Sequence, residues 1–196
     1  MLEKSKQKLY TLKNVPQQYQ IHTPALKVLI DRQQVERRVG ELALEIAADY
    51  AEKAPLFVGI LTGAAQFMMA LIDRLPDELL ARLDYDFVDV SSYRGRESTG
   101  RVELVKDLAV AVAGREVLVV DGIVDTGRSL DFVMAMIRSR QPLALKTCTL
   151  LDKSARRVVP VAVDYCGFEI EDAFVVGCGM DCDQHYRALR HIAVIE

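Results

Sequence analysis

Apolar and polar positions along the chain alternate in runs that predict strands and helices in turn. Between residues 32 and 51, apolar side chains recur every three or four positions with charges between them, which predicts an amphipathic helix. Residues 56–61 form an apolar run typical of a buried strand, and residues 65–75 predict a helix that ends before Pro76. Residues 83–90 alternate apolar and acidic side chains, as a half-exposed strand does.

The same alternation continues in the second half of the chain. Residues 117–121 and 143–151 predict two further buried strands, with a helix over 130–137 between them. Strands and helices in turn predict an α/β fold, a mostly parallel twisted sheet flanked by helices, in which ligands bind beyond the carboxyl ends of the strands. Short strands over 161–168, 174–177 and 192–195 predict a small hood on this sheet.

The domain organisation follows from where these patterns begin. Residues 1–26 are polar, with Pro16 and Pro24 as breakers, and are expected to form an N-terminal arm. Residues 27–196 then form a single domain, whose hood comes largely from 160–196.

Composition and charge narrow the class of protein. The chain has 196 residues, 51% of them hydrophobic, which suffices for one globular core. Its net charge of -3 lacks the basic surplus that sequence-independent nucleic-acid binding needs. No apolar run approaches the roughly 20 residues of a membrane-spanning helix, and no apolar segment follows the N-terminal lysines. We therefore expect a cytoplasmic protein with neither nucleic-acid nor membrane partners.

Four cysteines fall late in the chain, mostly inside apolar runs, which favours free, buried thiols over disulfides. The cluster Cys178, Cys182 and His185 does not match the common spacings of zinc ligands. We therefore expect no metal at this cluster.

The segment 117–130 carries the clearest chemistry. An apolar strand leads to two carboxylates, Asp121 and Asp125, after which Thr126, Gly127 and Ser129 begin a helix. Free backbone N–H groups and the helix dipole at such a start bind phosphate, and a glycine lets the backbone approach the anion. The alternative is that Asp125 or Thr126 merely caps the helix. The loop residues alone leave both interpretations open.

This segment resembles the phosphoribosyl pyrophosphate signature of the type I phosphoribosyltransferases, an apolar strand and acidic positions followed by two apolar residues and Asp-Thr-Gly. The resemblance extends over residues 27–196 and is closest to the hypoxanthine-guanine branch. Residues 61–63 resemble the family's pyrophosphate loop and residues 91–100 its mobile catalytic loop. Residues 146–153, 163–170 and 174–177 resemble its purine-binding strand and hood.

The resemblance implies a type I phosphoribosyltransferase fold and a purine-salvage activity. Such an enzyme moves the 5-phosphoribosyl group from phosphoribosyl pyrophosphate to N9 of hypoxanthine or guanine with Mg2+, giving IMP or GMP and pyrophosphate. It also implies a homodimer or homotetramer. Two alternatives stay open: a weakened member of the family that senses purine nucleotides, and a transferase that prefers xanthine.

The resemblance also implies roles for individual residues on the phosphate side of the site. The phosphoribosyl group would be held by Asp121, Asp125, Thr126, Gly127, Arg128 and Ser129. Asp125 would also be the catalytic residue, accepting a proton at N7 of the purine. Pyrophosphate would be held by Leu61, Thr62, Gly63, Ser92 and Tyr93, with residues 92–100 closing as a lid. The Leu61–Thr62 peptide bond would be cis.

On the purine side, Lys146 would donate to the 6-oxo group, so adenine should be a poor substrate. Tyr165 would stack on the base, Cys166 would present backbone groups to its edge, and Asp172 would complete the purine site. Asp121 and Asp172 would ligate the magnesium ion.

The chain departs from the family pattern at two positions. Thr62 stands where the family usually carries a basic residue, and Gly122 stands where it carries a second acidic residue. The lost carboxylate removes an anchor for a ribose hydroxyl or for water on magnesium, so we expect weaker binding of the phosphoribosyl donor. The same two positions motivate the sensor alternative.

Overall fold

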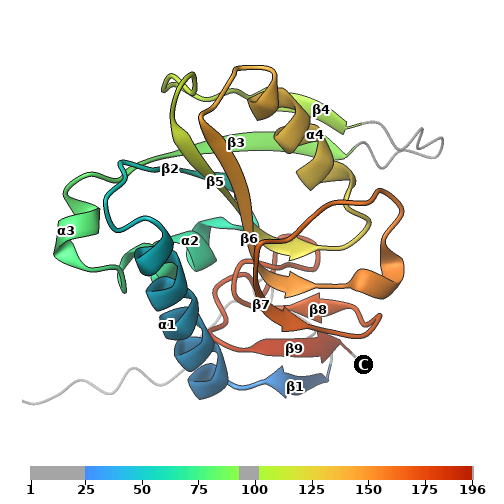
Figure 1. Cartoon of the computed structure of the whole chain (residues 1–196). Coiled ribbons are helices and arrows are strands. Elements are labelled where there is room, and N and C mark those ends of the chain that lie inside the picture. The colour runs from blue at the N-terminus through green and yellow to red at the C-terminus, as the bar shows by residue number, and fades with distance from the viewer. Residues whose placement is uncertain (1–24, 93–101, 196) are drawn as a thin grey trace, which may run out of the picture.

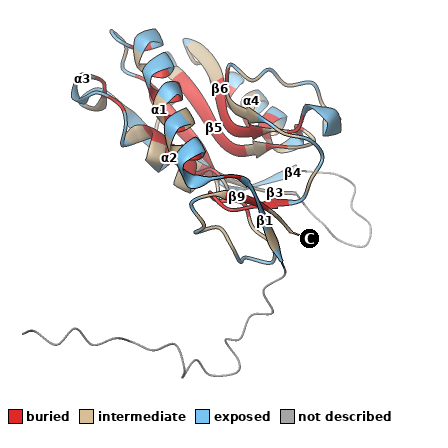
Figure 2. Cartoon of the chain, turned by 90° about the horizontal axis from the view of Figure 1, so that it is seen from below, coloured by how far each residue is buried: buried red, intermediate tan, exposed pale blue. Residues whose placement is uncertain are grey.

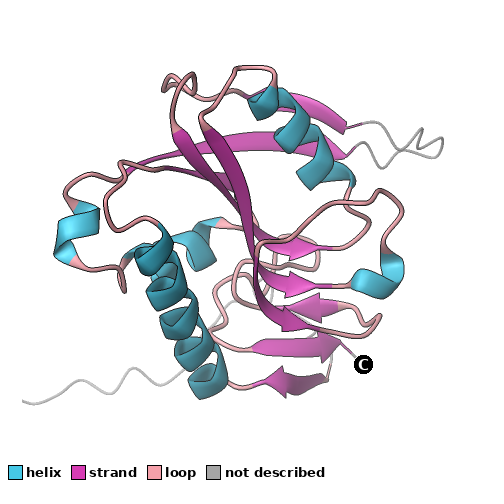
Figure 3. Ribbon diagram, viewed as in Figure 1, coloured by secondary structure: helices cyan, strands magenta, loops and turns pink. Residues whose placement is uncertain are grey.

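The computed structural model describes residues 25–92 and 102–195, which fold into a six-stranded sheet, a three-stranded sheet and the helices around them (Figures 1 and 3). The helices are α1 (Arg32–Asp49), α2 (Ala65–Ile72), α3 (Asp77–Leu80) and α4 (Arg128–Arg138), with a short 3-10 helix at Ser154–Arg156. The strands are β1 (Leu26–Ile30), β2 (Leu56–Leu61), β3 (Asp84–Ser92), β4 (Val102–Lys106), β5 (Glu116–Val124), β6 (Ala144–Asp152), β7 (Tyr165–Glu169), β8 (Val175–Val176) and β9 (Ile192–Ile195).

The large sheet has the order β4-β3-β2-β5-β6-β7. Its neighbours pair in parallel, except that β4 returns antiparallel to β3. The prediction of an α/β fold with a mostly parallel sheet is therefore confirmed, and the carboxyl ends of β2, β5 and β6 meet at one edge.

Helices cover both faces of this sheet because the side chains of β5 alternate between two cores. Leu118 and Val120 pack in the core that contains α1 and α2, whereas Val117 and Val119 pack in the core that contains α4. In Figure 2 the buried strand β5 accordingly lies between helices on either side. A strand buried on both faces has no polar alternation, which explains its continuous apolar run.

The small sheet has the order β1-β9-β8 and is antiparallel throughout. It forms the hood, and it combines residues 26–30 with residues near the C-terminus. The strand expected over 161–168 begins only at Tyr165, and as β7 it pairs with β6 in the large sheet rather than in the hood. Part of the segment 160–196 therefore belongs to the main sheet.

Several element boundaries differ from the sequence predictions. Helix α1 starts where expected, because Asp31 and Gln34 form a reciprocal capping box at its N-terminus. Helix α2 ends at Ile72, short of the predicted residue 75, and β5 runs past Asp121 to Val124. Within the described residues, no helix is both long and apolar enough to cross a membrane.

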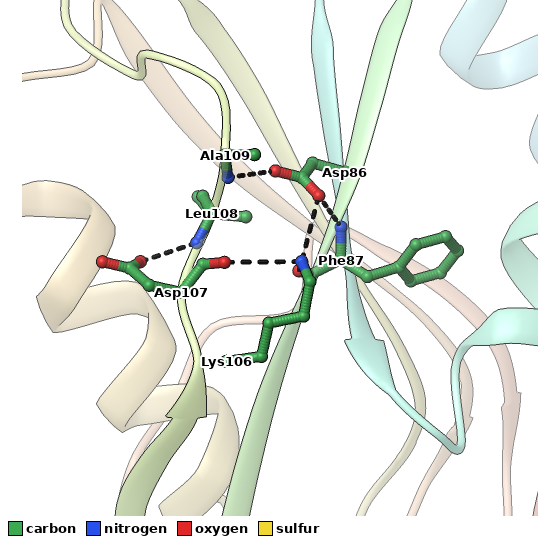
Figure 4. A network of polar contacts seen from close by, with 6 residues as sticks. All are labelled: Asp86, Phe87, Lys106, Asp107, Leu108 and Ala109. Atoms are coloured by element: carbon green, nitrogen blue, oxygen red, sulfur yellow. Dashed lines mark hydrogen bonds and ion pairs between the residues drawn. The ribbon is translucent and has the colours of Figure 1, made fainter.

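A polar network ties β4 back onto β3 (Figure 4). The Asp86 carboxylate accepts from the backbone N–H groups of Phe87 at 2.7 Å and Ala109 at 2.6 Å, and from the Lys106 ammonium at 3.3 Å. Asp107 forms an ion pair at 2.8 Å with Arg140, which lies in the segment after α4. The network fixes the two strands that flank residues 93–101 in the sequence.

Candidate active site

The segment between β5 and α4 surrounds a cavity of about 150 Å3. The cavity is lined by Asp121 and by the successive residues Ile123, Val124, Asp125, Thr126, Gly127, Arg128, Ser129 and Leu130. All six residues that the sequence assigned to the phosphoribosyl group therefore surround one cavity at the carboxyl edge of the sheet.

Gly127 is the residue that starts α4. It takes the left-handed conformation, with φ 85°, and no side chain caps the helix. The alternative that Asp125 or Thr126 caps the helix is therefore wrong, and a helix start without a side-chain cap is a place where an anion can bind. A Cβ atom at this position would lie 2.5 Å from the carbonyl oxygen of Val159, so only glycine fits.

The back of the loop is held by the chain that follows β6. The Thr126 carbonyl accepts hydrogen bonds from the N–H groups of Val158 and Val159, both at 3.0 Å. Arg157 and Asp152 form an ion pair nearby, with 16% and 13% of their side chains exposed. These contacts give the phosphate loop a rigid support that does not depend on its own side chains.

Asp121 lies inside β5 rather than at its end, and it is 9% exposed. Burial raises the pKa of its carboxyl to about 7, against the backbone N–H groups of Gly122 and Ile123, which act to lower it. A buried carboxylate of this kind is stabilised by a cation or by ligand hydroxyl groups. Asp121 is therefore suited to the ribose or to a metal ion bound with the substrate.

The pyrophosphate loop begins where β2 ends. The Leu61–Thr62 peptide bond is cis, as the sequence resemblance implied. The Gly63 carbonyl packs between β5 and the hood, because Cβ atoms at Gly122 and Gly179 would lie 2.6 Å and 2.0 Å from its oxygen. The loop thus joins the main sheet to the hood beside the Asp121 cavity. Among the other expected pyrophosphate residues, Ser92 ends β3, and Tyr93 and the lid segment 93–100 lie outside the described residues.

The structure does not bring Lys146 to this site. Lys146 pairs with Leu118 in the register of β5 and β6, whereas Asp152 at the end of β6 pairs with Val124. Six residues of strand separate Lys146 from that edge, roughly 20 Å at about 3.3 Å per residue. Its ammonium lies 2.6 Å from the Asp49 carboxylate of α1, which raises the pKa of Lys146.

Tyr165 and Cys166 are also engaged elsewhere. The Tyr165 hydroxyl donates to Asp49 and accepts from Lys146, so the ring packs toward α1. The carbonyl of Cys166 accepts a hydrogen bond from Arg38 of α1 at 2.8 Å. The structure therefore does not bring Lys146, Tyr165 and Cys166 to the cavity of residues 121–130; their contacts fasten α1 to β6 and β7.

Asp172 is connected to Asp125, in the loop of residues 121–130, through the side chain of Arg156. Arg156 places its Nε 3.2 Å from Asp125 and its Nη1 3.3 Å from Asp172. Asp172 is therefore linked to Asp125 through the Arg156 guanidinium, and its expected role as a metal ligand stays a prediction.

Three residues at this edge were missed by the sequence analysis. Lys153 follows β6, is 5% exposed, and donates its backbone N–H to the Val124 carbonyl at 3.0 Å. Within residues 25–92 and 102–195 its ammonium has no ion pair.

Arg187 donates to the Gly179 carbonyl at 2.7 Å and pairs with Asp181 at 2.8 Å, beside the pyrophosphate loop. A lysine at the end of a buried strand is a detectable signal, whereas Asp181 and Arg187 reach the site only by hood folding.

Phe174 is a fourth candidate, since 54% of this aromatic residue is exposed directly before β8. It lies two residues beyond Asp172, which Arg156 links to the Asp125 carboxylate. An exposed ring close to the loop of residues 121–130 is suited to stacking on a planar ligand.

The fold and this cavity define an α/β protein with a candidate anion-binding site beyond the carboxyl ends of its strands. Comparison with known families gives the class: residues 27–183 match the family model of the phosphoribosyl transferase domain, and the chain belongs to that family.

Named relatives agree with this assignment. The chain is 39% identical over 171 residues to the hypoxanthine-guanine phosphoribosyltransferase of Bacillus subtilis, covering 87% of this chain and 93% of that protein. It is also 39% identical over 185 residues to the bifunctional protein TilS/HprT of Listeria innocua, covering 94% of this chain. The chain spans only 28% of the length of that bifunctional relative.

A solved structure gives the same answer for the fold. The crystal structure of a hypoxanthine-guanine phosphoribosyltransferase from Bacillus anthracis superposes with a TM-score of 0.79 at 37% identity, covering 88% of this chain and 99% of that one. The type I phosphoribosyltransferase fold expected from the sequence is therefore confirmed.

Proposed function

We propose that the chain transfers the 5-phosphoribosyl group from phosphoribosyl pyrophosphate to N9 of a 6-oxopurine, in purine salvage. The bond from N9 to C1′ forms, the bond from C1′ to pyrophosphate breaks, and the purine loses one proton to Asp125. The observation that carries this proposal is the cavity of residues 121–130, with its left-handed Gly127 and uncapped helix start, in a chain of this family. Much of the catalysis is then stabilisation of the charge that leaves with pyrophosphate.

Lys153 and Phe174 are the residues that we assign to the base. Lys153 supplies a buried ammonium at the end of β6, and an ammonium donates to a 6-oxo group but finds no acceptor in an exocyclic amine. Hypoxanthine and guanine are therefore preferred over adenine. Phe174 stacks on the ring from the side of the hood.

The acidic residues fit a magnesium ion that enters with the substrate. The described residues bring no three His, Cys, Asp or Glu side chains together as a metal cage, which suits an ion held by one or two carboxylates and by substrate oxygens. Asp121 is one such carboxylate, and Asp181 beside the pyrophosphate loop is the second. When bound there, the ion would supply positive charge that offsets the charge of the departing pyrophosphate.

The remaining assignments concern the lid and the assembly. Backbone groups of residues 61–63 bind pyrophosphate, and Ser92 and Tyr93 stay assigned to pyrophosphate as further ligands. We expect a homodimer or homotetramer in the cytoplasm, and light scattering measures the assembly directly.

A steady-state assay tests the proposed function. The purified chain is supplied with magnesium and phosphoribosyl pyrophosphate, and hypoxanthine, guanine, xanthine and adenine are offered separately. We expect nucleotide from the 6-oxopurines, little from adenine, and a loss of about a hundredfold or more in Asp125→Asn. Asp131→Asn, in the exposed first turn of α4, is the matched control and keeps its activity.

Other outcomes of this assay identify the alternatives. A clear preference for xanthine would replace the substrate assignment while keeping the reaction. Absence of turnover with every base, together with tight binding of IMP or GMP in calorimetry, would overturn the enzymatic proposal in favour of a nucleotide sensor.

A further inference from the structure

Arg156 forms a bridge between the loop of residues 121–130 and the segment that enters the hood. Its Nε lies 3.2 Å from Asp125 Oδ1 and its Nη1 lies 3.3 Å from Asp172 Oδ1. Oδ1 of Asp125 is itself buried and accepts no hydrogen bond from the described residues. The charged group that lies close to Oδ1 of Asp125 is therefore the Arg156 guanidinium.

The backbone fixes Arg156 opposite Asp125. Before Arg156, the N–H of Lys153 donates to the carbonyl of Val124 at 3.0 Å. After Arg156, the N–H groups of Val158 and Val159 donate to the carbonyl of Thr126 at 3.0 Å. The two segments that flank Arg156 are thus hydrogen-bonded to the two residues that flank Asp125. This register places the backbone of Arg156 opposite Asp125, within reach of its guanidinium.

Asp172 extends the bridge toward the base-binding side. It lies in the segment between β7 and β8, and Phe174 follows two residues later. The side chains of Asp125, Arg156 and Asp172 are 38%, 48% and 56% exposed, so solvent weakens each single ion pair. What the two pairs supply is the placement of a charge: they keep the Arg156 guanidinium beside Oδ1 of Asp125.

We propose that Arg156 is a positioning residue for Asp125. The guanidinium charge lies beside Oδ1 without a hydrogen bond to it, and Oδ2 is the oxygen that takes the proton from the purine when the N9–C1′ bond forms and pyrophosphate departs. Through Asp172, the same guanidinium ties the direction of this carboxylate to the placement of Phe174. The inference rests on the proposed function, because it concerns the proton acceptor of that reaction.

Kinetics of Arg156→Ala test the proposal. We expect kcat for nucleotide formation to fall about tenfold, as for a misplaced general base, while the KM for phosphoribosyl pyrophosphate changes less than about twofold. Added guanidinium chloride, well below denaturing concentrations, restores part of kcat, and Arg156→Lys retains more activity than Arg156→Ala. Asp172→Asn gives a smaller loss than Arg156→Ala. Arg138→Ala, which removes an exposed arginine from the end of α4, is the matched control and changes neither constant.

A double-mutant cycle separates positioning from general stabilisation. In the Asp125→Asn background, removal of Arg156 lowers the residual rate by less than about twofold, because its target is already gone. If the wild-type protein turns over and Arg156→Ala has the same kcat, the positioning role is overturned and the proposed transferase activity stands. A loss that guanidinium does not restore, accompanied by a lowered melting temperature, would assign Arg156 to stability instead. A wild-type protein without turnover would overturn both proposals.

Discussion

The carbonyl oxygen of Gly63 lies 2.6 Å from the position that a Cβ atom would take at Gly122. Gly63 belongs to the pyrophosphate loop and Gly122 to β5, so the close approach seats the loop directly against the sheet. On the other side of the same oxygen, a Cβ atom at Gly179 of the hood would lie at 2.0 Å. The departure from the family pattern at Gly122 therefore has a packing reason: the loop occupies the space of the missing side chain.

We expect Gly122→Asp, which introduces the acidic residue of the family pattern, to weaken the enzyme rather than improve it. The new side chain must displace the backbone of the pyrophosphate loop, since a backbone carbonyl cannot rotate away as a side-chain tip can. A shift of this kind should raise the KM for phosphoribosyl pyrophosphate roughly tenfold or more. Steady-state kinetics at saturating purine measure it.

Two variants serve as controls for this prediction. Gly122→Ala carries only the Cβ atom and should show the same direction with a smaller effect. Thr62→Lys adds positive charge without filling the junction of Gly63 and Gly122, and should leave KM unchanged or lower it. A lower KM in Gly122→Asp would show that the missing carboxylate matters more than the packing.

Lys146 and Lys153 are expected to behave oppositely when each is replaced by methionine. Lys153→Met should lower kcat/KM for hypoxanthine about tenfold to a hundredfold, because a charged hydrogen bond to the 6-oxo group is worth about 1.5–3 kcal/mol. Lys146→Met removes an ion pair with Asp49 near the opposite end of β6, and should change kcat/KM less than about twofold. Parallel assays with hypoxanthine and adenine distinguish the two.

The stability of these variants provides the complementary measurement. Lys146→Met should lower the free energy of unfolding by about 1 kcal/mol or less, because the pair with Asp49 is partly exposed. If Lys146→Met instead abolished preference for 6-oxopurines, the placement of the base at Lys153 would be wrong.

The elements that sequence patterning predicted are those buried on one or both faces. Strands β2 and β9 match their predicted bounds, and α1 differs only at its end, because their apolar positions face a core. Strands β1 and β4 were not predicted. Most of their side chains are exposed, and pairing with β9 and β3 holds them in place. Such edge strands carry little periodic signal of their own.

The phosphate half and the purine half of the proposed site also differ in how far the sequence predicts them. The cavity of the proposed phosphate half was predictable because its lining residues are contiguous, and one loop closes one cavity. The residues of the proposed purine half were not, because their position depends on which end of a strand a residue occupies. Lys146 and Lys153 belong to one run of sequence, yet the register of β6 against β5 puts Lys146 opposite Leu118 and Lys153 beyond Asp152 at the other end.

Replacing Asp121 with asparagine should raise the free energy of unfolding and weaken ligand binding. The carboxyl is buried, and its pKa is raised to about 7 because burial disfavours the charged form. At pH 8 the unliganded protein therefore holds a costly buried charge. Asp121→Asn should raise the free energy of unfolding by roughly 1–3 kcal/mol at that pH, while weakening the binding of phosphoribosyl pyrophosphate.

Urea unfolding of the unliganded protein at pH 8, with calorimetry of the donor, measures both effects of Asp121→Asn. Asp131→Asn on the surface of α4 should change neither quantity by more than about 0.5 kcal/mol. A destabilised Asp121→Asn protein would mean that the carboxylate is a structural requirement of β5 rather than a group reserved for the ligand.

The polar network between β3 and β4 predicts a pH-dependent contribution to stability from Asp86. Burial acts to raise the pKa of Asp86, but hydrogen bonds from the backbone N–H groups of Phe87 and Ala109 and from the Lys106 ammonium outweigh it and hold the pKa below its usual value (Figure 4). A carboxyl with a lowered pKa binds fewer protons in the folded state than in the unfolded state. Its contribution is therefore fully present above the unfolded pKa of about 4 and is lost as the pH falls through the folded pKa.

Asp86→Asn should accordingly lower the free energy of unfolding by about 2 kcal/mol at pH 7, because the amide cannot accept all three hydrogen bonds. The difference from wild type should stay constant down to about pH 5 and shrink below about pH 4, as wild-type Asp86 becomes protonated. Urea unfolding over this pH range measures it. Asp84→Asn on the same strand, with 63% of the Asp84 side chain exposed and paired to Arg115, is the control and should cost about 1 kcal/mol or less. A deficit of Asp86→Asn that is equal at pH 7 and pH 3.5 would mean that the network stabilises the strands through its shape alone, without the charge of Asp86.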